Sequence, residues 1–267
     1  MDKIGLIAGN RRFPIVFSEA AKKKNCSIVA VAIKGETSHQ LKKYVDRIHW
    51  ISLSDFRAMF EIFKVEGVKK IVMAGQISPY RLFSREVNQN IDLKKLLDSI
   101  KDRKANTIFE AIAERLKEFG FELIDSTTFI GDMLPKKAVL TAREPNLEEW
   151  DNIHFGMPIA KEIARLDIGL TIAVKNKAVV AVEALEGTDN LIRRAGSIAR
   201  GGTVIIKVSR PDQDMRFDIP VIGLNTVKTL IRSGAGCMAI ESNKTLFIDQ
   251  EASVKLADRK SVSIVSV

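Results

Sequence analysis

The chain has 267 residues, of which 46% are hydrophobic and 28% charged, as is typical of a globular protein. A chain of this length forms two domains or one large one. No apolar run reaches the about 20 residues of a membrane-spanning helix. The cysteines, Cys26 and Cys237, lie far apart, which argues against a disulfide framework and a thiolate metal site. The N-terminus enters a strand pattern directly and does not show the pattern of a signal peptide. Together with the cysteine usage and the lack of an apolar span, this leads us to expect a cytoplasmic protein.

Basic residues outnumber acidic ones by 42 to 33, which gives a net charge of +9. Most of them fall in short clusters at expected helix ends and turns, where cations are common. There is no dense arginine tract and no recognisable nucleic-acid module, which argues against nucleic acid as a partner. The charge is compatible with an anionic membrane surface or an anionic small substrate.

Strand and helix patterns alternate along the first half of the chain. The helical period is clear at Phe56, Met59, Phe60 and Phe63, which share one face. Strands are expected at 3–8, 27–33, 47–52, 70–74 and 121–124, and helices at 13–24, 55–65, 91–100 and 107–119. Such alternation implies right-handed crossovers and a parallel sheet covered on both faces. We therefore predict an α/β fold with a Rossmann-like parallel-sheet domain at residues 1–135.

The periodicity fades over residues 136–148, which we interpret as a linker to a distinct α/β domain at 149–267. That domain opens with helical spacing around Pro158, which is expected to start or kink the helix. Residues 171–174 and 178–183 predict a β-hairpin. Further helices are expected at 190–199 and 226–232 and late in the chain, and strands at 203–208, 236–240, 245–248 and 262–265.

The turn after the first strand is a candidate anion site. Gly9 permits close backbone approach, Asn10 and Arg11 follow it, and the next helix offers free N–H groups. Gly75 and Gln76 follow another strand at the same sheet edge, so they are expected to line the same crevice. The segment lacks the G-x-G-x-x-G fingerprint, which disfavours a nicotinamide-dependent oxidoreductase. A plain structural turn remains the alternative.

The loop that follows strand 203–208 is dense in mixed charge. With Lys207 at the end of that strand, it combines Asp214, Asp218, Arg216 and the amide of Gln213 around two prolines. Such a loop can hold an anion with its cations and a hard divalent metal with its carboxylates. The alternative is a solvated loop whose charges have no role.

A second acidic segment, Glu186-Gly187-Thr188-Asp189, enters the helix at 190–199. Thr188 is a good helix N-cap and Asp189 suits the positive end of the helix dipole, so a structural role alone would explain both residues. The three histidines are too scattered for a dinuclear metallophosphoesterase centre. Any hydrolysis must therefore depend on carboxylates, basic residues and an oxygen-ligated ion such as Mg²⁺.

Four motifs resemble one family, the LpxI-type UDP-2,3-diacylglucosamine pyrophosphatases of lipid A biosynthesis. They occupy residues 4–9, 165–169, 182–189 and 213–223, in the order of the family, and the resemblance runs essentially end to end. It implies a Rossmann-like domain, a C-terminal domain of the family's own and a substrate bound between them. It also implies Mg²⁺-dependent cleavage of the diphosphate to UMP and 2,3-diacylglucosamine 1-phosphate.

The resemblance makes Asp218 the aspartate needed for catalysis, as metal ligand or base. Two departures motivate the rival hypothesis of a catalytically impaired nucleotide-sugar-binding or regulatory protein. The family commonly has an Asp pair where Asn106 and Thr107 stand, and Gln where Leu170 stands.

The sequence thus predicts a hydrolase whose partner is a UDP-linked diacyl glucosamine lipid. It would be peripheral to the inner membrane, in contact with its anionic surface, and a homodimer is a candidate assembly. The expected metal ligands are Asp218 and Asp214. The expected substrate-binding residues are Gly9, Asn10, Arg11, Gly75, Gln76, Glu186, Gly187, Thr188, Asp189, Lys207, Gln213 and Arg216.

Overall fold

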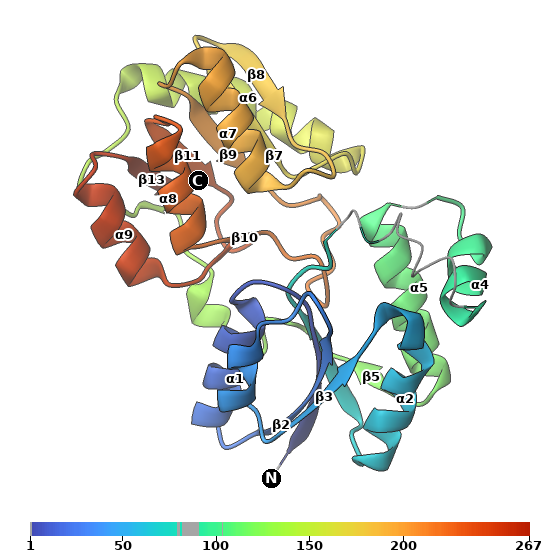
Figure 1. The fold of residues 1–267 in the computed structure, drawn as a ribbon. Helices are drawn as coiled ribbons and strands as arrows, with labels where there is room; N and C mark the ends of the chain where they lie inside the picture. Colours follow the sequence, from blue (N-terminus) through green and yellow to red (C-terminus); the bar gives the residue numbers. More distant parts are fainter. Residues whose placement is uncertain (1, 79–80, 82–90, 103) are drawn as a thin grey trace. The chain divides into compact units, whose positions relative to one another are not determined.

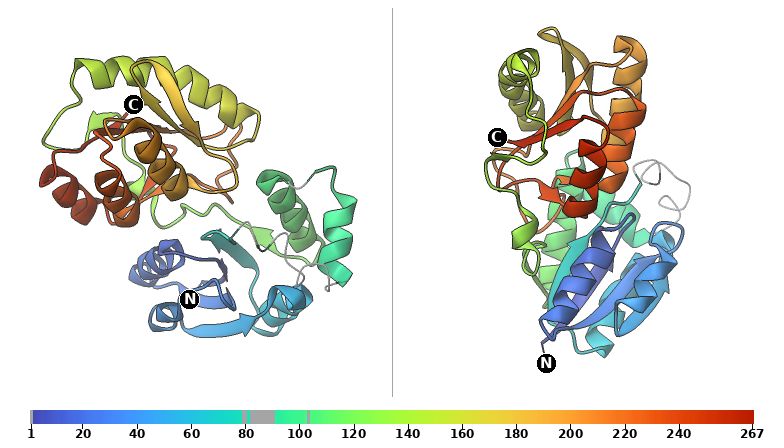
Figure 2. Two further views of the ribbon diagram at one scale, coloured as in Figure 1. Left: turned by 45° about the horizontal axis from the view of Figure 1, so that its top comes forward. Right: turned by 90° about the vertical axis from the view of Figure 1, so that its left-hand side faces the viewer.

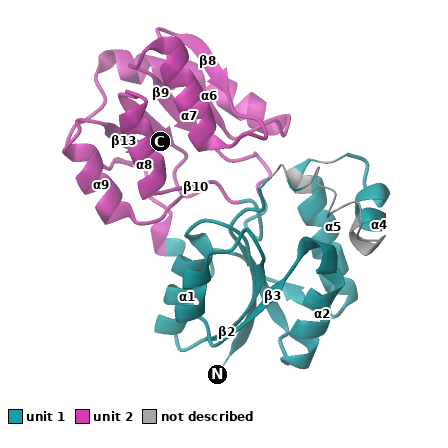
Figure 3. Cartoon of the chain, viewed as in Figure 1, with its two compact units in different colours: residues 1–131, 214–218 teal, residues 132–213, 219–267 magenta. Residues whose placement is uncertain are grey.

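The computed structural model describes residues 2–78, 81, 91–102 and 104–267. The chain divides into two compact units (Figures 1 and 3). Unit 1 consists of Met1–Gly131 and Asp214–Asp218, and unit 2 of Asp132–Gln213 and Ile219–Val267. No helix in the described part of the chain is both long and apolar enough to cross a bilayer.

Unit 1 is built on a five-stranded parallel sheet with the order β3-β2-β1-β4-β5. The strands are β1 (Lys3–Ala8), β2 (Ser27–Ile33), β3 (Arg47–Ile51), β4 (Lys70–Ala74) and β5 (Glu122–Leu123). The five strands expected in this half are therefore present, three of them with the predicted bounds. The order is that of the first five strands of the doubly wound dinucleotide-binding fold.

Helices cover both faces of this sheet. They are α1 (Phe13–Lys23), α2 (Phe56–Val65), α4 (Ile91–Ser99) and α5 (Ala105–Glu118). Met59, Phe60 and Phe63 of α2 pack on alternate residues of β2, namely Val29, Val31 and Ile33. The residues between these, such as Ala30, are also buried and point to the opposite face of the sheet. Helix α1 lies on the other side of the sheet from α2 (Figure 1). The helical period predicted for α2 thus marks its buried face.

Unit 2 contains a six-stranded mixed sheet with the order β6-β13-β11-β9-β7-β8. Its strands are β6 (Ala138–Val139), β7 (Thr171–Lys175), β8 (Ala178–Val182), β9 (Val204–Lys207), β11 (Cys237–Ile240) and β13 (Ser263–Ser266). Strands β9, β11 and β13 are parallel, and β7 and β8 form the predicted antiparallel hairpin. Strands β10 (Val221–Ile222) and β12 (Leu246–Phe247) form a separate parallel pair.

The sheet of unit 2 lies between two helical layers (Figure 2). Helix α6 (Leu147–Arg165) packs on one face, against residues such as Val204 and Ile206 of β9. Ile205, which points the other way, packs with α7 (Thr188–Ala199), α8 (Leu224–Arg232) and α9 (Gln250–Asp258). Pro158 lies inside α6 and does not start a helix, because the structure begins this helix earlier, at a capping box on Asn146.

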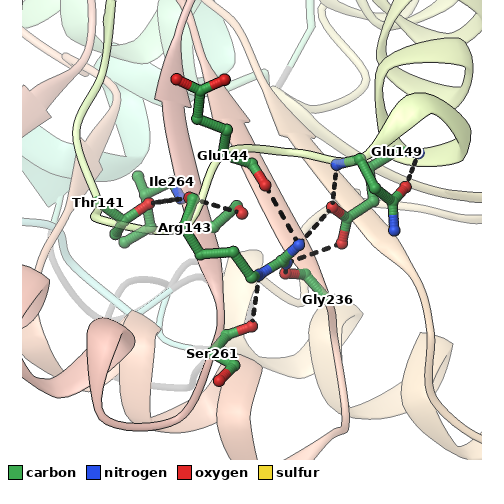
Figure 4. Close-up of polar contacts among 9 residues, drawn as sticks. Thr141, Arg143, Glu144, Glu149, Gly236, Ser261 and Ile264 are labelled. Atoms are coloured by element: carbon green, nitrogen blue, oxygen red, sulfur yellow. Dashed lines mark hydrogen bonds and ion pairs between the residues drawn. The ribbon is translucent and has the colours of Figure 1, made fainter.

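The segment 136–148, expected to be a linker, belongs to unit 2. Strand β6 pairs antiparallel with β13, and Arg143 connects the segment to the rest of the unit (Figure 4). The Arg143 guanidinium donates to both carboxylate oxygens of Glu149, at 2.8 and 2.9 Å, and to the carbonyls of Ser261 and Gly236. Glu149 also accepts a hydrogen bond from the backbone N–H of Asn146, so the same ion pair holds the start of α6.

Residues 214–218 leave unit 2 and pack on unit 1. The Phe217 ring is 1% exposed within the core of unit 1, with its centroid 5.6 Å from that of Phe109. Ser126, just after β5, donates its backbone N–H to the Met215 carbonyl at 3.0 Å. Its hydroxyl lies 2.7 Å from both the Met73 carbonyl of β4 and the Arg216 carbonyl. This loop therefore lies at the edge of the sheet where β4 ends.

Replacing Phe217 with alanine should lower the free energy of unfolding of unit 1 by about 3–5 kcal/mol, the usual cost of removing a buried aromatic ring. Phe119→Ala is the matched control, because Phe119 is 39% exposed. Urea denaturation followed by circular dichroism measures both, with separate transitions fitted if the units unfold independently. Equal, small losses for the two variants would contradict a core position for Phe217.

Candidate active site

The turns that follow β1 and β4 pack backbone to backbone. The N–H of Gly9 donates to the Ala74 carbonyl and that of Asn10 to the Gln76 carbonyl, both at 2.8 Å. A Cβ on Gly9 would lie 2.6 Å from the Gln76 carbonyl oxygen. Gly75 has a φ of +85°, and a Cβ there would lie 2.5 Å from the Asn10 carbonyl oxygen. Glycine is therefore required at both positions, and four predicted substrate-binding residues meet where ligands bind in open α/β sheets.

Glu36, which sequence reasoning missed, joins three strand ends at this edge. It follows β2, and its side chain is only 1% exposed. Its Oε2 accepts hydrogen bonds from the Asn10 amide at 2.8 Å and from the Ser78 backbone N–H and hydroxyl at 3.1 and 2.8 Å. An Arg81 guanidinium nitrogen lies 3.8 Å from its Oε1. The sequence did contain a signal for Glu36. It is a carboxylate three residues after β2, and the carboxyl end of β2 lies at the same sheet edge as Asn10.

The N-terminus of α1 suits an anion. Its N-cap, Arg12, makes no side-chain capping hydrogen bond, Pro14 stands in the first turn, and no acidic residue lies there. Arg11 is exposed and has a φ of +65°. The first N–H groups of a helix and its dipole favour negative charge. The predicted role of Arg11 is compatible with this arrangement.

The loop 214–218 contains two of the predicted site carboxylates, Asp214 and Asp218. Arg216 donates to both oxygens of Asp214, at 3.0 and 2.6 Å, and these hydrogen bonds hold the pKa of Asp214 below its ordinary value. Asp218 is half-buried and has a φ of +50°. Residues other than glycine adopt this conformation at a cost, and such strain is common at functional sites. Asp218 is thus the one carboxylate of this loop with a left-handed backbone, which is compatible with its predicted catalytic role.

These residues fit Mg²⁺ only in part. No group of three or more His, Cys, Asp or Glu side chains in the described residues could hold a metal ion. Both oxygens of Asp214 are engaged by Arg216, which makes this residue a poor ligand. Mg²⁺ is commonly held by one or two protein carboxylates together with water and substrate phosphates. Asp218 alone fits that kind of site.

A second polar cluster surrounds Lys207 in unit 2. Lys207 ends β9 and is 4% exposed. Its ammonium donates to the hydroxyl of Thr188 at 2.8 Å and to that of Thr171 at 3.3 Å. The Thr188 hydroxyl donates in turn to Oε1 of Glu183, at 2.9 Å. The buried cation and the buried carboxylate are therefore connected through one hydroxyl group.

Thr188 does not cap α7. The N-cap is Gly187, with a φ of +82°, and Thr188 is the first residue of the helix. Its hydroxyl is used by Lys207 and Glu183, so a capping role does not account for this threonine. Glu186 is exposed and forms an ion pair with Arg194, while Asp189 lies in the first turn of α7.

The start of the charged loop is held firmly within unit 2. The Arg210 guanidinium lies 2.8 Å from Oδ1 of Asp167. Glu241 accepts from the Ser209 backbone N–H and hydroxyl, at 2.7 and 2.8 Å, and pairs with Lys161 at 2.6 Å. Burial opposes ionisation of Glu241, but these hydrogen bonds hold its pKa below the ordinary value.

The predicted site residues thus form two groups. Unit 1 contains the group at the ends of β1, β2 and β4 and the loop with Asp214, Arg216 and Asp218. Unit 2 contains the group around Lys207, together with Gln213, which is 8% exposed. Leu170 packs at the edge of the α6-facing core of unit 2, and the side chain of Asn106 lies outside the described residues.

Comparison with known proteins supports one family. A curated relative is the UDP-2,3-diacylglucosamine pyrophosphatase LpxI of Caulobacter vibrioides, 27% identical over 277 aligned positions. The alignment covers 100% of this chain and 98% of the relative. Among solved structures, a biotin carboxylase domain of a single-chain bacterial carboxylase matches 67% of this chain and 37% of its own, with a TM-score of 0.26 and 13% identity. A likeness of that size says nothing about architecture or function.

Two family models match the chain, one for each half. The model of the LpxI N-terminal domain matches residues 3–133, and that of the LpxI C-terminal domain matches residues 136–265. Because the two models cover nearly the whole chain in the order of the family, this protein belongs to the LpxI family.

Proposed function

We propose that this protein hydrolyses the diphosphate of UDP-2,3-diacylglucosamine, giving UMP and 2,3-diacylglucosamine 1-phosphate for lipid A synthesis. The observation that carries the proposal is the end-to-end similarity to a relative named for this pyrophosphatase activity. The grouping of Gly9, Asn10, Gly75 and Gln76 at the carboxyl edge of a parallel sheet supports a nucleotide-linked substrate. Incubation with this lipid and Mg²⁺, followed by mass spectrometry of the products, tests it directly.

The reaction joins a water oxygen to one phosphorus while the bond from that phosphorus to the bridging oxygen breaks. We assign Asp218 to this step, as acceptor of the water proton or as a ligand of Mg²⁺. When bound, Mg²⁺ would neutralise charge on the diphosphate, held by Asp218 and the phosphate oxygens. Arg216 forms a bidentate ion pair with Asp214, which fixes its guanidinium within the loop that contains Asp218.

Lys207 is the second cation that we assign to binding of the substrate diphosphate. A buried ammonium is costly unless its donors are satisfied, and here two threonine hydroxyls satisfy two of them. The third N–H is left for a phosphate oxygen of the substrate. Glu183 acts on Lys207 through Thr188, as a positioning residue that fixes the direction of the hydroxyl.

The rival function is binding of a nucleotide sugar without hydrolysis, motivated by Asn106 and Leu170. Release of UMP separates the two functions, because a binding protein would retain the intact nucleotide sugar. The similarity to a relative named as a pyrophosphatase favours the enzyme.

Asp218→Asn should lower kcat at least ~100-fold, since it removes the charge of the proposed reactive carboxylate at almost constant size. Asp212→Asn is the matched control, because Asp212 is exposed in the neighbouring part of the same loop. UMP release is measured at several Mg²⁺ concentrations. Recovery of the Asp218→Asn variant at high Mg²⁺ would indicate a ligand, and no recovery a base. Equal rates for the Asp212→Asn and Asp218→Asn variants would refute the assignment.

Thr188→Val should lower kcat/KM by about tenfold, because valine keeps the shape but cannot accept from Lys207 or donate to Glu183. Thr188→Ser keeps the hydroxyl and should retain most of the activity. Steady-state UMP release at temperatures where both variants are folded provides the comparison. If the serine variant is as impaired as the valine variant, packing rather than the hydroxyl relay explains the loss.

A substrate with two acyl chains resides in lipid, so we also propose that the protein contacts an anionic membrane surface. The net charge of +9 is sufficient for weak binding, at up to about 1 kcal/mol for each well-placed Lys or Arg. Sedimentation with phosphatidylglycerol vesicles should therefore show binding at low salt that fades toward ~0.5 M salt, where the Debye length becomes short. Salt-independent binding that is equal on neutral vesicles would point to apolar contact instead.

A further inference from the structure

An arginine-lined cavity of about 580 Å³ lies in unit 2, where the C-terminal ends of α7 and α8 meet. Arg193 and Arg200 come from α7 and its C-cap, and Arg232 is the last residue of α8. The volume is within the range of sites for small ligands. The cavity shares no residue with those assigned to hydrolysis above.

The floor of the cavity is made by small residues. A Cβ on Gly196 would lie 2.5 Å from the Ser233 carbonyl oxygen, and one on Gly201 would lie 3.2 Å from that of Gly234. The N–H of Gly202 donates to the Gly234 carbonyl at 2.7 Å. The two helix ends therefore approach with almost no side chain between them, which leaves a hollow with long arginine side chains around it.

The charge of this cavity is uncompensated by its own lining. Its lining residues include three arginines and no carboxylate. Within the described residues, Arg193 bonds only to the Asn190 amide oxygen, and no hydrogen bond or ion pair is made by the side chain of Arg200 or Arg232. Elsewhere in unit 2, Arg194 and Arg210 each pair with a carboxylate. The cavity is thus a local excess of guanidinium groups.

Arg200 occupies a backbone position that favours glycine. As the C-cap of α7 it has φ +54° and ψ +41°, the left-handed conformation in which helices usually place glycine. The helix dipole explains cations near the C-terminal ends of α7 and α8. It does not explain an arginine in this strained conformation, nor Arg193, which lies two turns before Arg200. A ligand that needs all three side chains explains both.

We propose that this cavity binds a phosphate-bearing anion. Guanidinium groups bind phosphate through paired N–H donors, and the hydroxyls of Ser197, Thr229 and Ser233 add uncharged donors to the same lining. Two sources provide this chemistry: the headgroup of an anionic phospholipid and a soluble phosphate compound. The proposal does not depend on the hydrolytic reaction.

Arg200→Gly combined with Arg232→Ala tests the proposal. Glycine relieves the left-handed residue, so the variant should melt at the same or a higher temperature than the native protein, and loss of binding is then not loss of fold. The matched control is Arg259→Ala with Lys260→Ala, which removes the same charge from exposed positions of unit 2 outside the cavity. UMP release by both variants should stay at the native level when substrate is dispersed in neutral detergent.

Binding is measured with two probes, inorganic phosphate by ³¹P NMR titration and phosphatidylglycerol vesicles by sedimentation against phosphatidylcholine vesicles. The cavity variant should bind phosphate about tenfold or more weakly than the control, as expected when charge-assisted contacts are lost. A matching loss on phosphatidylglycerol vesicles identifies the lipid headgroup, whereas unchanged vesicle binding with phosphate binding lost identifies a soluble ligand. The proposal is overturned if the native protein binds neither probe or if the cavity and control variants behave alike on both.

Discussion

The insertion of Phe217 into the core of unit 1 is the constraint on which the candidate site depends. Residues on either side of 214–218 belong to unit 2, yet the Phe217 ring is buried among the side chains of α2, α5 and β4. A buried aromatic ring contributes several kcal/mol, which offsets a large part of the entropy lost when the charged side chains beside it are ordered. The ring therefore fixes the backbone of Asp218, and Ser126 fixes it a second time through β4. Asp218, the carboxylate that we propose for catalysis, therefore belongs structurally to unit 1, although the rest of its sequence motif lies in unit 2.

The sheet edge beside this loop is held by hydrogen bonds and not by the burial of an apolar side chain. Gly9 and Gly75 let two turns touch, and the buried carboxylate of Glu36 then gathers the Asn10 amide and Ser78. A buried carboxylate is costly unless it is hydrogen-bonded, and Asn10 and Ser78 supply the hydrogen bonds to one oxygen of Glu36. The edge is pre-organised before any ligand arrives, because rearranging one strand end would leave the charge of Glu36 unsatisfied.

Local patterns predicted the elements well, since strand and helix periods depend on the residues within each segment. The bounds of β1, β2 and β4 and the hairpin of β7 and β8 follow from such periods. Sequence reasoning failed where the deciding partner is distant. Strand β6 is two residues long and exists because β13 pairs with it. The true partners of Thr188 are Glu183 and Lys207, whereas proximity to a helix start suggested a cap. Glu36 belongs to no recognised motif. Residues 214–218 could not be assigned to unit 1 from the sequence, because the assignment depends on Phe217 packing in the core of that unit.

Three residues at these sites have a locally unfavourable backbone conformation or a buried charge. Asp218 and Arg200 both adopt left-handed conformations that glycine would adopt with less strain, and Lys207 is buried with two threonine hydroxyls as its hydrogen-bond acceptors. Each exception has neighbours that hold it in place. These are Phe217 and Ser126 beside Asp218, the closely packed Gly196, Gly201 and Gly234 beside Arg200, and Thr188 with Glu183 beside Lys207. Strain of this kind persists only where surrounding contacts over-determine it, and it gathers where a protein meets its ligands. Arg200 has a left-handed backbone and lines a cavity that contains none of the residues assigned to hydrolysis. For this reason we interpret Arg200 as a ligand contact and not only as a basic residue at a helix end.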